Sequence, residues 1–138
     1  MLYDPAMVQP MRDELTQLGI QELLTTEDVD SYFGDKSGTC FVIINSVCGC
    51  AAGGARPGLI AALQNEKKPA RIATVFAGME KEATQQTRGY FGQVPPSSPS
   101  MALLKDGELV HFVPRHMIEG RTPDLVAEDL KKAFDEYC

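Results

Sequence analysis

A nearly continuous run of apolar and β-branched residues at 39–44 constrains the fold more than any other feature of the sequence. It reads Thr-Cys-Phe-Val-Ile-Ile, without the polar alternation of a half-exposed strand. Such a run is typical of a strand that is buried on both faces. A second run of this kind lies at 71–77, and between the two runs Leu59, Ile60 and Leu63 have helical spacing. We therefore predict two parallel strands joined through a helical crossover.

Helix and strand patterns elsewhere complete the order of elements. Apolar spacing, capping residues and acid-rich first turns predict helices at 6–18, 25–34, 80–90 and from Thr122 onward. Strand patterns cover 20–24, 101–104 and 109–113. Asp106-Gly107 between the last two strands indicates an antiparallel hairpin. This order matches a thioredoxin fold, so we expect one α/β, thioredoxin-like domain over residues 1–138, with a central mixed sheet flanked by helices and an N-terminal helical extension.

Length and charge limit the classes of function. With 138 residues the chain is long enough to bury one substantial core. A net charge of -6 and a pI near 4.8 argue against nucleic acid or an anionic membrane as partner, because both attract clustered Lys and Arg. The amino terminus lacks the pattern of a secretory signal, and no run approaches the roughly 18 apolar residues of a membrane span. We expect a cytoplasmic protein, where cysteines serve chemistry more often than structural disulfides.

Two of the four cysteines form the motif Cys48-Gly49-Cys50, between the strand predicted at 39–44 and the helix that follows it. A cysteine at a helix amino terminus is favoured as the thiolate, because unpaired backbone N–H groups and the positive end of the helix dipole face it. Cys48 is thus the expected nucleophile, and Cys50 is the expected resolving thiol. A ring with one intervening residue is tight, although Gly49 relieves part of the strain. Since strained disulfides are more oxidising, we expect a dithiol that accepts electrons readily.

Two other interpretations of the motif stay open. It could supply two ligands to a zinc ion, but a structural site needs about four. The other candidate ligands are scattered along the chain, at Cys40, Cys138, His111 and His116. The two cysteines could also be small buried hydrophobic residues, against which the surrounding glycines argue. We therefore expect no metal site.

Residues outside the motif are weaker candidates. Pro99 precedes the hairpin, where thioredoxin-like folds hold a cis-proline beside the dithiol, and an ordinary trans-proline loop is the alternative. Arg56 could stabilise the Cys48 thiolate by its charge, and a solvated helix surface would explain it equally well. Cys40 is expected in the core, and the terminal Cys138 is expected to be incidental. Both histidines are expected to be structural or surface residues rather than general bases.

The residues around the dithiol form a highly specific segment. It reads Asn45-Ser46-Val47-Cys48-Gly49-Cys50-Ala51-Ala52-Gly53 and continues as Ala55-Arg56-Pro57-Gly58. Further characteristic segments are Pro10-Met11-Arg12-Asp13-Glu14-Leu15-Thr16, Pro95-Pro96-Ser97-Ser98-Pro99-Ser100 and Pro114-Arg115-His116. On these residues the sequence resembles the bacilliredoxin family of small bacterial thioredoxin-like proteins.

The resemblance implies a thioredoxin-like fold, a C-G-C active site and removal of the low-molecular-weight thiol bacillithiol from mixed disulfides on client proteins. It implies that Cys48 takes over the bacillithiol adduct and that Cys50 resolves or regulates it. The expected partners are client proteins, a recycling reductant and bacillithiol or a similar thiol as co-substrate, with no bound cofactor. Two alternatives are a general protein disulfide isomerase or reductase, and a non-enzymatic metal-binding or redox-sensing module.

Overall fold

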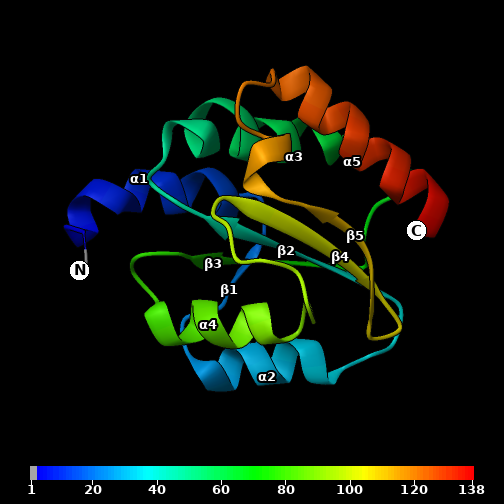
Figure 1. The fold of residues 1–138 in the computed structure, drawn as a ribbon, viewed down its shortest axis with the longest axis horizontal. Helices are drawn as coiled ribbons and strands as arrows, with labels where there is room; N and C mark the ends of the chain where they lie inside the picture. Colours follow the sequence, from blue (N-terminus) through cyan, green and yellow to red (C-terminus); the bar gives the residue numbers. More distant parts are fainter. Residues whose placement is uncertain (1–2) are drawn as a thin grey trace.

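The structure, a computed structural model, describes residues 3–138 and is built around a five-stranded sheet (Figure 1). The strands span β1 Gln21–Glu22, β2 Thr39–Asn45, β3 Arg71–Phe76, β4 Ser100–Lys105 and β5 Glu108–Val113. They lie in the order β1-β3-β2-β4-β5. β3 is parallel to both β1 and β2, whereas β4 is antiparallel to β2 and β5 is antiparallel to β4. The predicted mixed sheet, with its parallel pair and final hairpin, is confirmed.

β2 is the central strand, and every one of its residues is buried. Successive side chains of a strand point to opposite faces of the sheet. Phe41 and Ile43 accordingly belong to one hydrophobic cluster, while Val42 and Ile44 belong to another. Neither face of this strand meets solvent, which is why its sequence is apolar without alternation.

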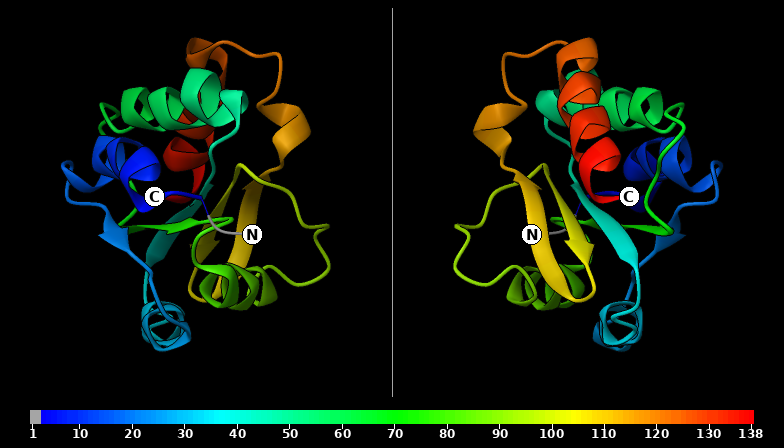
Figure 2. Two further views of the ribbon diagram at one scale, coloured as in Figure 1. Left: turned by 90° about the vertical axis from the view of Figure 1, so that its left-hand side faces the viewer. Right: turned by 90° about the vertical axis from the view of Figure 1, so that its right-hand side faces the viewer.

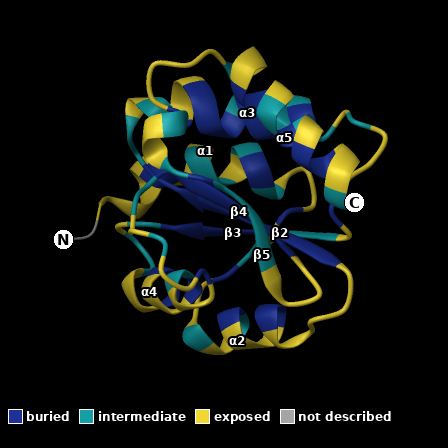
Figure 3. Ribbon diagram, turned by 45° about the vertical axis from the view of Figure 1, so that its right-hand side comes forward, coloured by how far each residue is buried: buried dark blue, intermediate teal, exposed yellow. Residues whose placement is uncertain are grey.

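Helices cover both faces of the sheet, as Figures 1 and 2 show from three directions. On one face lie α1 (Pro5–Thr16), α3 (Arg56–Ala62) and α5 (Pro123–Tyr137), and on the other lie α2 (Thr26–Gly34) and α4 (Lys81–Gly89). The strands are largely buried, whereas the outer sides of the helices are exposed (Figure 3). None of the helices within residues 3–138 has the length and apolar character needed to cross a membrane.

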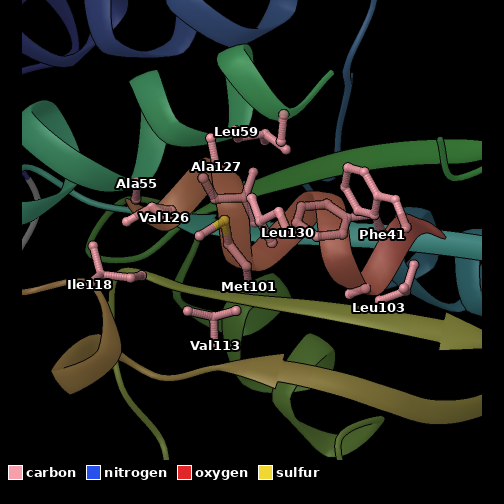
Figure 4. Packing of buried hydrophobic residues seen from close by; sticks show 14 of the residues in the cluster. Phe41, Ala55, Leu59, Met101, Leu103, Val113, Ile118, Val126, Ala127 and Leu130 are labelled. Carbon is pink, nitrogen blue, oxygen red and sulfur yellow. The ribbon is translucent and has the colours of Figure 1, made fainter. Parts of the chain in front are cut away.

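The core beneath α3 and α5 is the larger of the two clusters. Leu59 of α3 and Leu130 of α5 pack there against Met101 and Leu103 of β4 (Figure 4). The two helices approach so closely at Gly58 that an added Cβ would lie 2.6 Å from a methyl carbon of Val126. Only glycine fits at this crossing, so it fixes how α5 lies over α3.

Two elements are shorter than their patterns predict. β1 is an edge strand that pairs only with β3, through Gln21 and Glu22, rather than over the predicted 20–24. α1 ends at Thr16 rather than at residue 18. The N–H of Leu18 donates to Leu15 O and that of Gly19 to Thr16 O, so the chain tightens there into an i to i+3 turn. Gly19 then leaves the helix with φ of +85°.

Candidate active site

The dithiol lies where β2 ends and a helix begins. β2 ends at Asn45 and the helical segment starts at Gly49, so Cys48 occupies the position just before the first turn. The backbone N–H of Cys48 donates to Ser46 Oγ at 3.1 Å, which holds the loop between strand and helix. The predicted place of Cys48 at a helix amino terminus is confirmed.

The helix after the dithiol is continuous from Gly49 to Ala62, but its turns at Ala51–Ala55 are π-helical. This wider turn consists only of alanine and glycine. Its Gly54 faces Ile118, whose side-chain carbon would lie 3.0 Å from an added Cβ. Apolar periodicity predicts the helix but not the π turn, because the turn contains no large side chain whose spacing would reveal it.

The two sulfurs are in direct contact. Cys48 Sγ lies 2.8 Å from Cys50 Sγ, and both cysteines are free and half-buried. The backbone N–H of Cys50 also donates to Cys48 Sγ, at 3.4 Å. A mixed disulfide on Cys48 is therefore within immediate reach of Cys50.

The surroundings distinguish the two thiols. The pKa of Cys48 lies below its ordinary value because the Cys50 thiol and then the Cys50 backbone N–H donate to its sulfur, with a further contribution from the charge of Arg115. The pKa of Cys50 is raised, first by its hydrogen bond to Cys48 and then by burial. These opposite directions support the expected roles, with Cys48 as thiolate and Cys50 as thiol at the same pH.

Arg115 and Glu119 lie beside the dithiol and were not predicted as site residues. They belong to the segment that begins with a short 3-10 helix, η2 (Arg115–Met117), after β5. Arg115 Nη2 lies 3.1 Å from Glu119 Oε2, and Cys50 Sγ donates to the same oxygen at 3.7 Å. No local spacing marks these residues, because β4 and β5 separate them from the dithiol in sequence.

Arg56 does not have the place that the sequence suggests. It is 2% exposed, so the alternative of a solvated helix surface is wrong. Its guanidinium donates to Asn45 Oδ1 at 2.8 Å, to Ser46 O at 3.0 Å and to Glu14 at 3.1 Å. The cation whose charge lowers the pKa of Cys48 is Arg115. Arg56 instead anchors the loop that leads to the dithiol.

A hollow of about 380 Å³ opens at Cys48. Its wall includes Ser46, Gly78, Ser98 and Arg115 beside the nucleophile. The peptide bond between Ser98 and Pro99 is cis, so of the two alternatives for this proline the structure has the cis form. All these segments meet because the carboxyl ends of β2 and β3 and the amino end of β4 lie at the same end of the sheet.

Gly49 lies in an open place. An added Cβ would meet no atom within 4 Å, and this residue is not among those with positive φ. Neither crowding nor backbone conformation therefore requires glycine in the reduced protein. Its role in relieving a strained disulfide ring stays a prediction.

The remaining candidates lie apart from the dithiol. Cys40 is buried in the core, as predicted, and Cys138 is exposed at the end of the chain. His111 pairs with Asp129 at 3.1 Å on β5 and α5, whereas His116 is exposed. Across residues 3–138, His, Cys, Asp and Glu side chains form no group of three or more that could hold a metal ion.

Comparison with known proteins agrees with this geometry. A family model described as "Disulphide isomerase" matches residues 3–138. A bacilliredoxin of Geobacillus kaustophilus is 55% identical over 99% of this chain and 94% of its own length, and one of Halalkalibacterium halodurans is 53% identical over the same shares. A bacilliredoxin of Koribacter versatilis is 50% identical, again over 99% of this chain and 94% of the relative.

Solved structures show the same fold at low sequence identity. Thioredoxin from Fasciola hepatica superposes with a TM-score of 0.59 at 17% identity, covering 86% of this chain and all of that one. Mitochondrial thioredoxin 3 from Saccharomyces cerevisiae gives a TM-score of 0.57 at 14% identity, covering 86% and 96%. The fold is thioredoxin-like, as predicted. The chain belongs to the bacilliredoxin family, and its fold and dithiol are those of a thiol-disulfide oxidoreductase.

Proposed function

We propose that this protein removes bacillithiol from mixed disulfides on client proteins. The observation that carries the proposal is the pair of half-exposed thiols in contact, one favoured as thiolate and the other as thiol. Such a pair accepts a small thiol on one sulfur and keeps a second sulfur ready to release it. The names of the relatives point to the same chemistry.

The first step is a single exchange of thiolate for thiolate. The Cys48 thiolate attacks the bacillithiol sulfur of the mixed disulfide, and the bond between bacillithiol and client breaks. The client sulfur leaves as a thiolate, and Cys48 now holds bacillithiol in a disulfide. The number of disulfide bonds is unchanged, so this step needs no other oxidant or reductant.

The second step regenerates the protein. Cys50 loses its proton to solvent and attacks Cys48 Sγ, so bacillithiol leaves as a thiolate and the Cys48–Cys50 disulfide forms. The contact of 2.8 Å between the sulfurs supports this step. A recycling thiol reductant then supplies two electrons and returns both cysteines to thiols. No bound cofactor takes part in either step.

General disulfide isomerisation is the second candidate function. The description of the matching family model favours it, and the hollow at Cys48 is open to a protein substrate as well as to a small one. An isomerase would attack a protein disulfide and release it rearranged, without an adduct of bacillithiol on Cys48. The two functions therefore differ in the species that Cys48 carries.

Mass spectrometry of the protein after mixing with a bacillithiolated client tests the proposal. We expect the bacillithiol mass to accumulate on Cys50→Ala, where release is blocked, and to be absent from Cys48→Ala. In the wild type it should be transient and followed by the Cys48–Cys50 disulfide. A scrambled ribonuclease provides the parallel test for isomerisation.

If no variant takes up the adduct while scrambled ribonuclease regains its native disulfides, the protein is an isomerase. If both cysteine variants take up the adduct equally, the roles of the two sulfurs are wrong. If none reacts and the protein instead binds zinc with loss of thiol reactivity, the metal-binding alternative holds.

A further inference from the structure

A second hollow of about 320 Å³ continues from the one at Cys48. The two share three wall residues, Ala77, Gly78 and Ser98, and the second extends along α4 to Lys81 and Arg88. A molecule whose sulfur lies at Cys48 could therefore extend past Gly78 onto the face of α4.

This groove lies where open α/β sheets commonly bind ligands. β2 and β3 are parallel neighbours, so their carboxyl ends meet at one edge. The chain after β2 turns to the face that carries α3, whereas the chain after β3 turns to the face that carries α4 (Figure 1). A crevice forms where neighbouring connections diverge to opposite faces.

The charge of the groove is positive, although the protein carries a net charge of -6. Its walls hold Arg115, Lys81 and Arg88, and no carboxylate of the described residues lines either hollow. The acid that precedes α4, Glu80, is already paired with Arg12 at 2.7 Å. Arg115 is itself paired with Glu119 at 3.1 Å, so an anionic ligand would meet two cations without an ion-pair partner among the described residues, Lys81 and Arg88, and no acid of the wall.

Arg88 lacks the partners that a half-buried guanidinium normally has. Within residues 3–138 its one hydrogen bond runs from Nη2 to Ser97 O at 3.4 Å, and it forms no ion pair. Its buried Nε has no acceptor. Burial lowers its pKa, which shows the cost of leaving this cation uncompensated. A buried cation is ordinarily paired.

Thr84 provides a second, independent observation. It stands one helical turn before Arg88 on α4, lines the same hollow and is 4% exposed. Its Oγ1 is buried and has no hydrogen-bond partner among the described residues. Threonines in helices commonly donate to the carbonyl one turn back, as Thr87 does to Ala83 O at 2.8 Å. Thr84 makes no such bond, so a buried hydroxyl without a partner lies in a residue that lines the hollow.

We propose that the groove is the binding site for a carboxylate-bearing small thiol, whose acid group pairs with Lys81 and Arg88 while its sulfur lies at Cys48. The inference rests on the proposed function and adds the site on α4 at which an acid group of the thiol binds. A guanidinium and an ammonium that line one hollow, two helical turns apart on α4, are suitable donors for a carboxylate.

Exchange kinetics with two matched disulfides test the site. Glutathione disulfide carries carboxylates and serves as the anionic probe, and its tetraethyl ester lacks them. We expect the double variant Lys81→Gln, Arg88→Gln to react about tenfold more slowly than wild type with the acid and within about twofold with the ester. Lys68→Gln, an exposed residue on the loop before β3 at the opposite edge of the sheet, is the matched control and should change neither rate.

Nuclear magnetic resonance reports the site without any exchange chemistry. S-methylglutathione has the carboxylates but no free thiol, and it should produce a saturable shift of the Arg88 Nε–H signal that its diethyl ester does not produce. Arg88→Lys should keep most of the preference for the acid, because it keeps the charge. Lys81→Gln alone, an exposed change, should still lower the rate with the acid if the double variant fails to fold.

The outcomes separate this inference from the proposed function. Equal loss of rate with acid and ester in the double variant, or no shift of the Arg88 signal, would overturn the carboxylate site while exchange at Cys48 stands. No reaction of wild type with either disulfide would count against the proposed function itself. Stronger inhibition by an acetylated Glu-Glu peptide amide than by S-methylglutathione would assign the site to acidic client segments and overturn the small-thiol assignment.

Discussion

The two ends of β2 place cysteines in opposite surroundings. Cys40 near the amino end is 5% exposed, and burial raises its pKa. Cys48 beyond the carboxyl end is half-exposed, and hydrogen bonds from Cys50 lower its pKa. The same thiol is therefore inert at one end of the strand and nucleophilic at the other. The reactivity of each thiol depends on its position relative to the strand, because the helix that begins after β2 has unpaired backbone N–H groups in its first turn.

The two ends also differ in what holds them. Cys40 packs in the cluster of Leu23, Val42 and Leu104, where burial has a larger effect on its pKa than the nearby charge of Arg71. The loop before Cys48 is held by the buried hydrogen bonds of Arg56. Burial at the amino end of β2 makes a thiol unreactive. Buried hydrogen bonds at the carboxyl end can fix the geometry of an exposed thiol.

The largest effect should come from replacing Cys48, the reactive cysteine of the two, and should be a loss of alkylation rate. Cys48→Ala should slow the fastest alkylation by iodoacetamide at pH 7 about tenfold, because burial raises the pKa of Cys40 and Cys138, and burial and the charge of Glu119 still act on Cys50. Cys40→Ala should leave the fast phase unchanged. Peptide mass spectrometry after timed quenching measures both. A fast phase that survives in Cys48→Ala would refute the contrast between the two ends.

Removing the hydrogen bonds of Arg56 to the loop before Cys48 should lower the stability of the protein. Arg56→Met leaves Ser46 O without its donor and Asn45 Oδ1 with only the N–H of Ser46, so we expect the free energy of unfolding to fall by about 2–4 kcal/mol. Urea denaturation measures the change. The exposed Arg121→Met is the control and should stay within about 0.5 kcal/mol of wild type. Equal stability of Arg56→Met and wild type would show that the loop does not depend on this anchor.

The pH dependence of alkylation should show how the charge of Arg115 affects the pKa of Cys48. Because the pKa of Cys48 is lowered, its reactive thiolate is present above that pKa and is lost as the pH falls through it, below the ordinary thiol value of 9.0. Arg115→Gln should move the midpoint upward and slow the reaction a few-fold at pH 7. Salt should diminish the difference, since Arg115 is exposed. A midpoint unchanged in Arg115→Gln at low salt would exclude this charge as a cause.

The smallest effect should concern the balance between the two active-site sulfurs. The charge of Glu119 raises the pKa of Cys50, so Glu119→Gln should let that pKa fall and shorten the life of a mixed disulfide on Cys48 about twofold. Quenched-flow mass spectrometry of the adduct measures its decay. Glu66→Gln, on the loop after α3, is the control. A longer-lived adduct in Glu119→Gln would mean that the carboxylate assists the proton transfer instead.

Local patterns were sufficient to predict most of the fold. The apolar run of β2, the Asp-Gly turn and the capped helices each depend on residues close in sequence, and the structure confirms them. β1 was predicted too long because edge pairing is decided by a neighbouring strand and not by local composition. The dithiol was recognisable because both sulfurs and the helix start lie within a few residues.

The other residues of the site could be identified only from the three-dimensional structure. Arg115 and Arg88 reach the groove, and Glu119 reaches Cys50, through the sheet topology, and no spacing in their local sequence relates them to the dithiol. The burial of Arg56 was also not predictable from local sequence. Arginine usually lies at the surface, and only the buried oxygens of Asn45 and Ser46 explain why this one does not.

The short spacing of Cys48 and Cys50 has a thermodynamic consequence. Closing a disulfide lowers the entropy of the unfolded chain in proportion to the logarithm of loop length, and a ring of three residues is worth only about 1.5 kcal/mol in that model. Around the cycle of folding and oxidation, the difference in unfolding free energy between the oxidised and reduced protein equals the shift in redox free energy that folding imposes. Denaturation curves of the two forms would therefore measure how far the fold moves the reduction potential of this dithiol from that of a free Cys-Gly-Cys peptide.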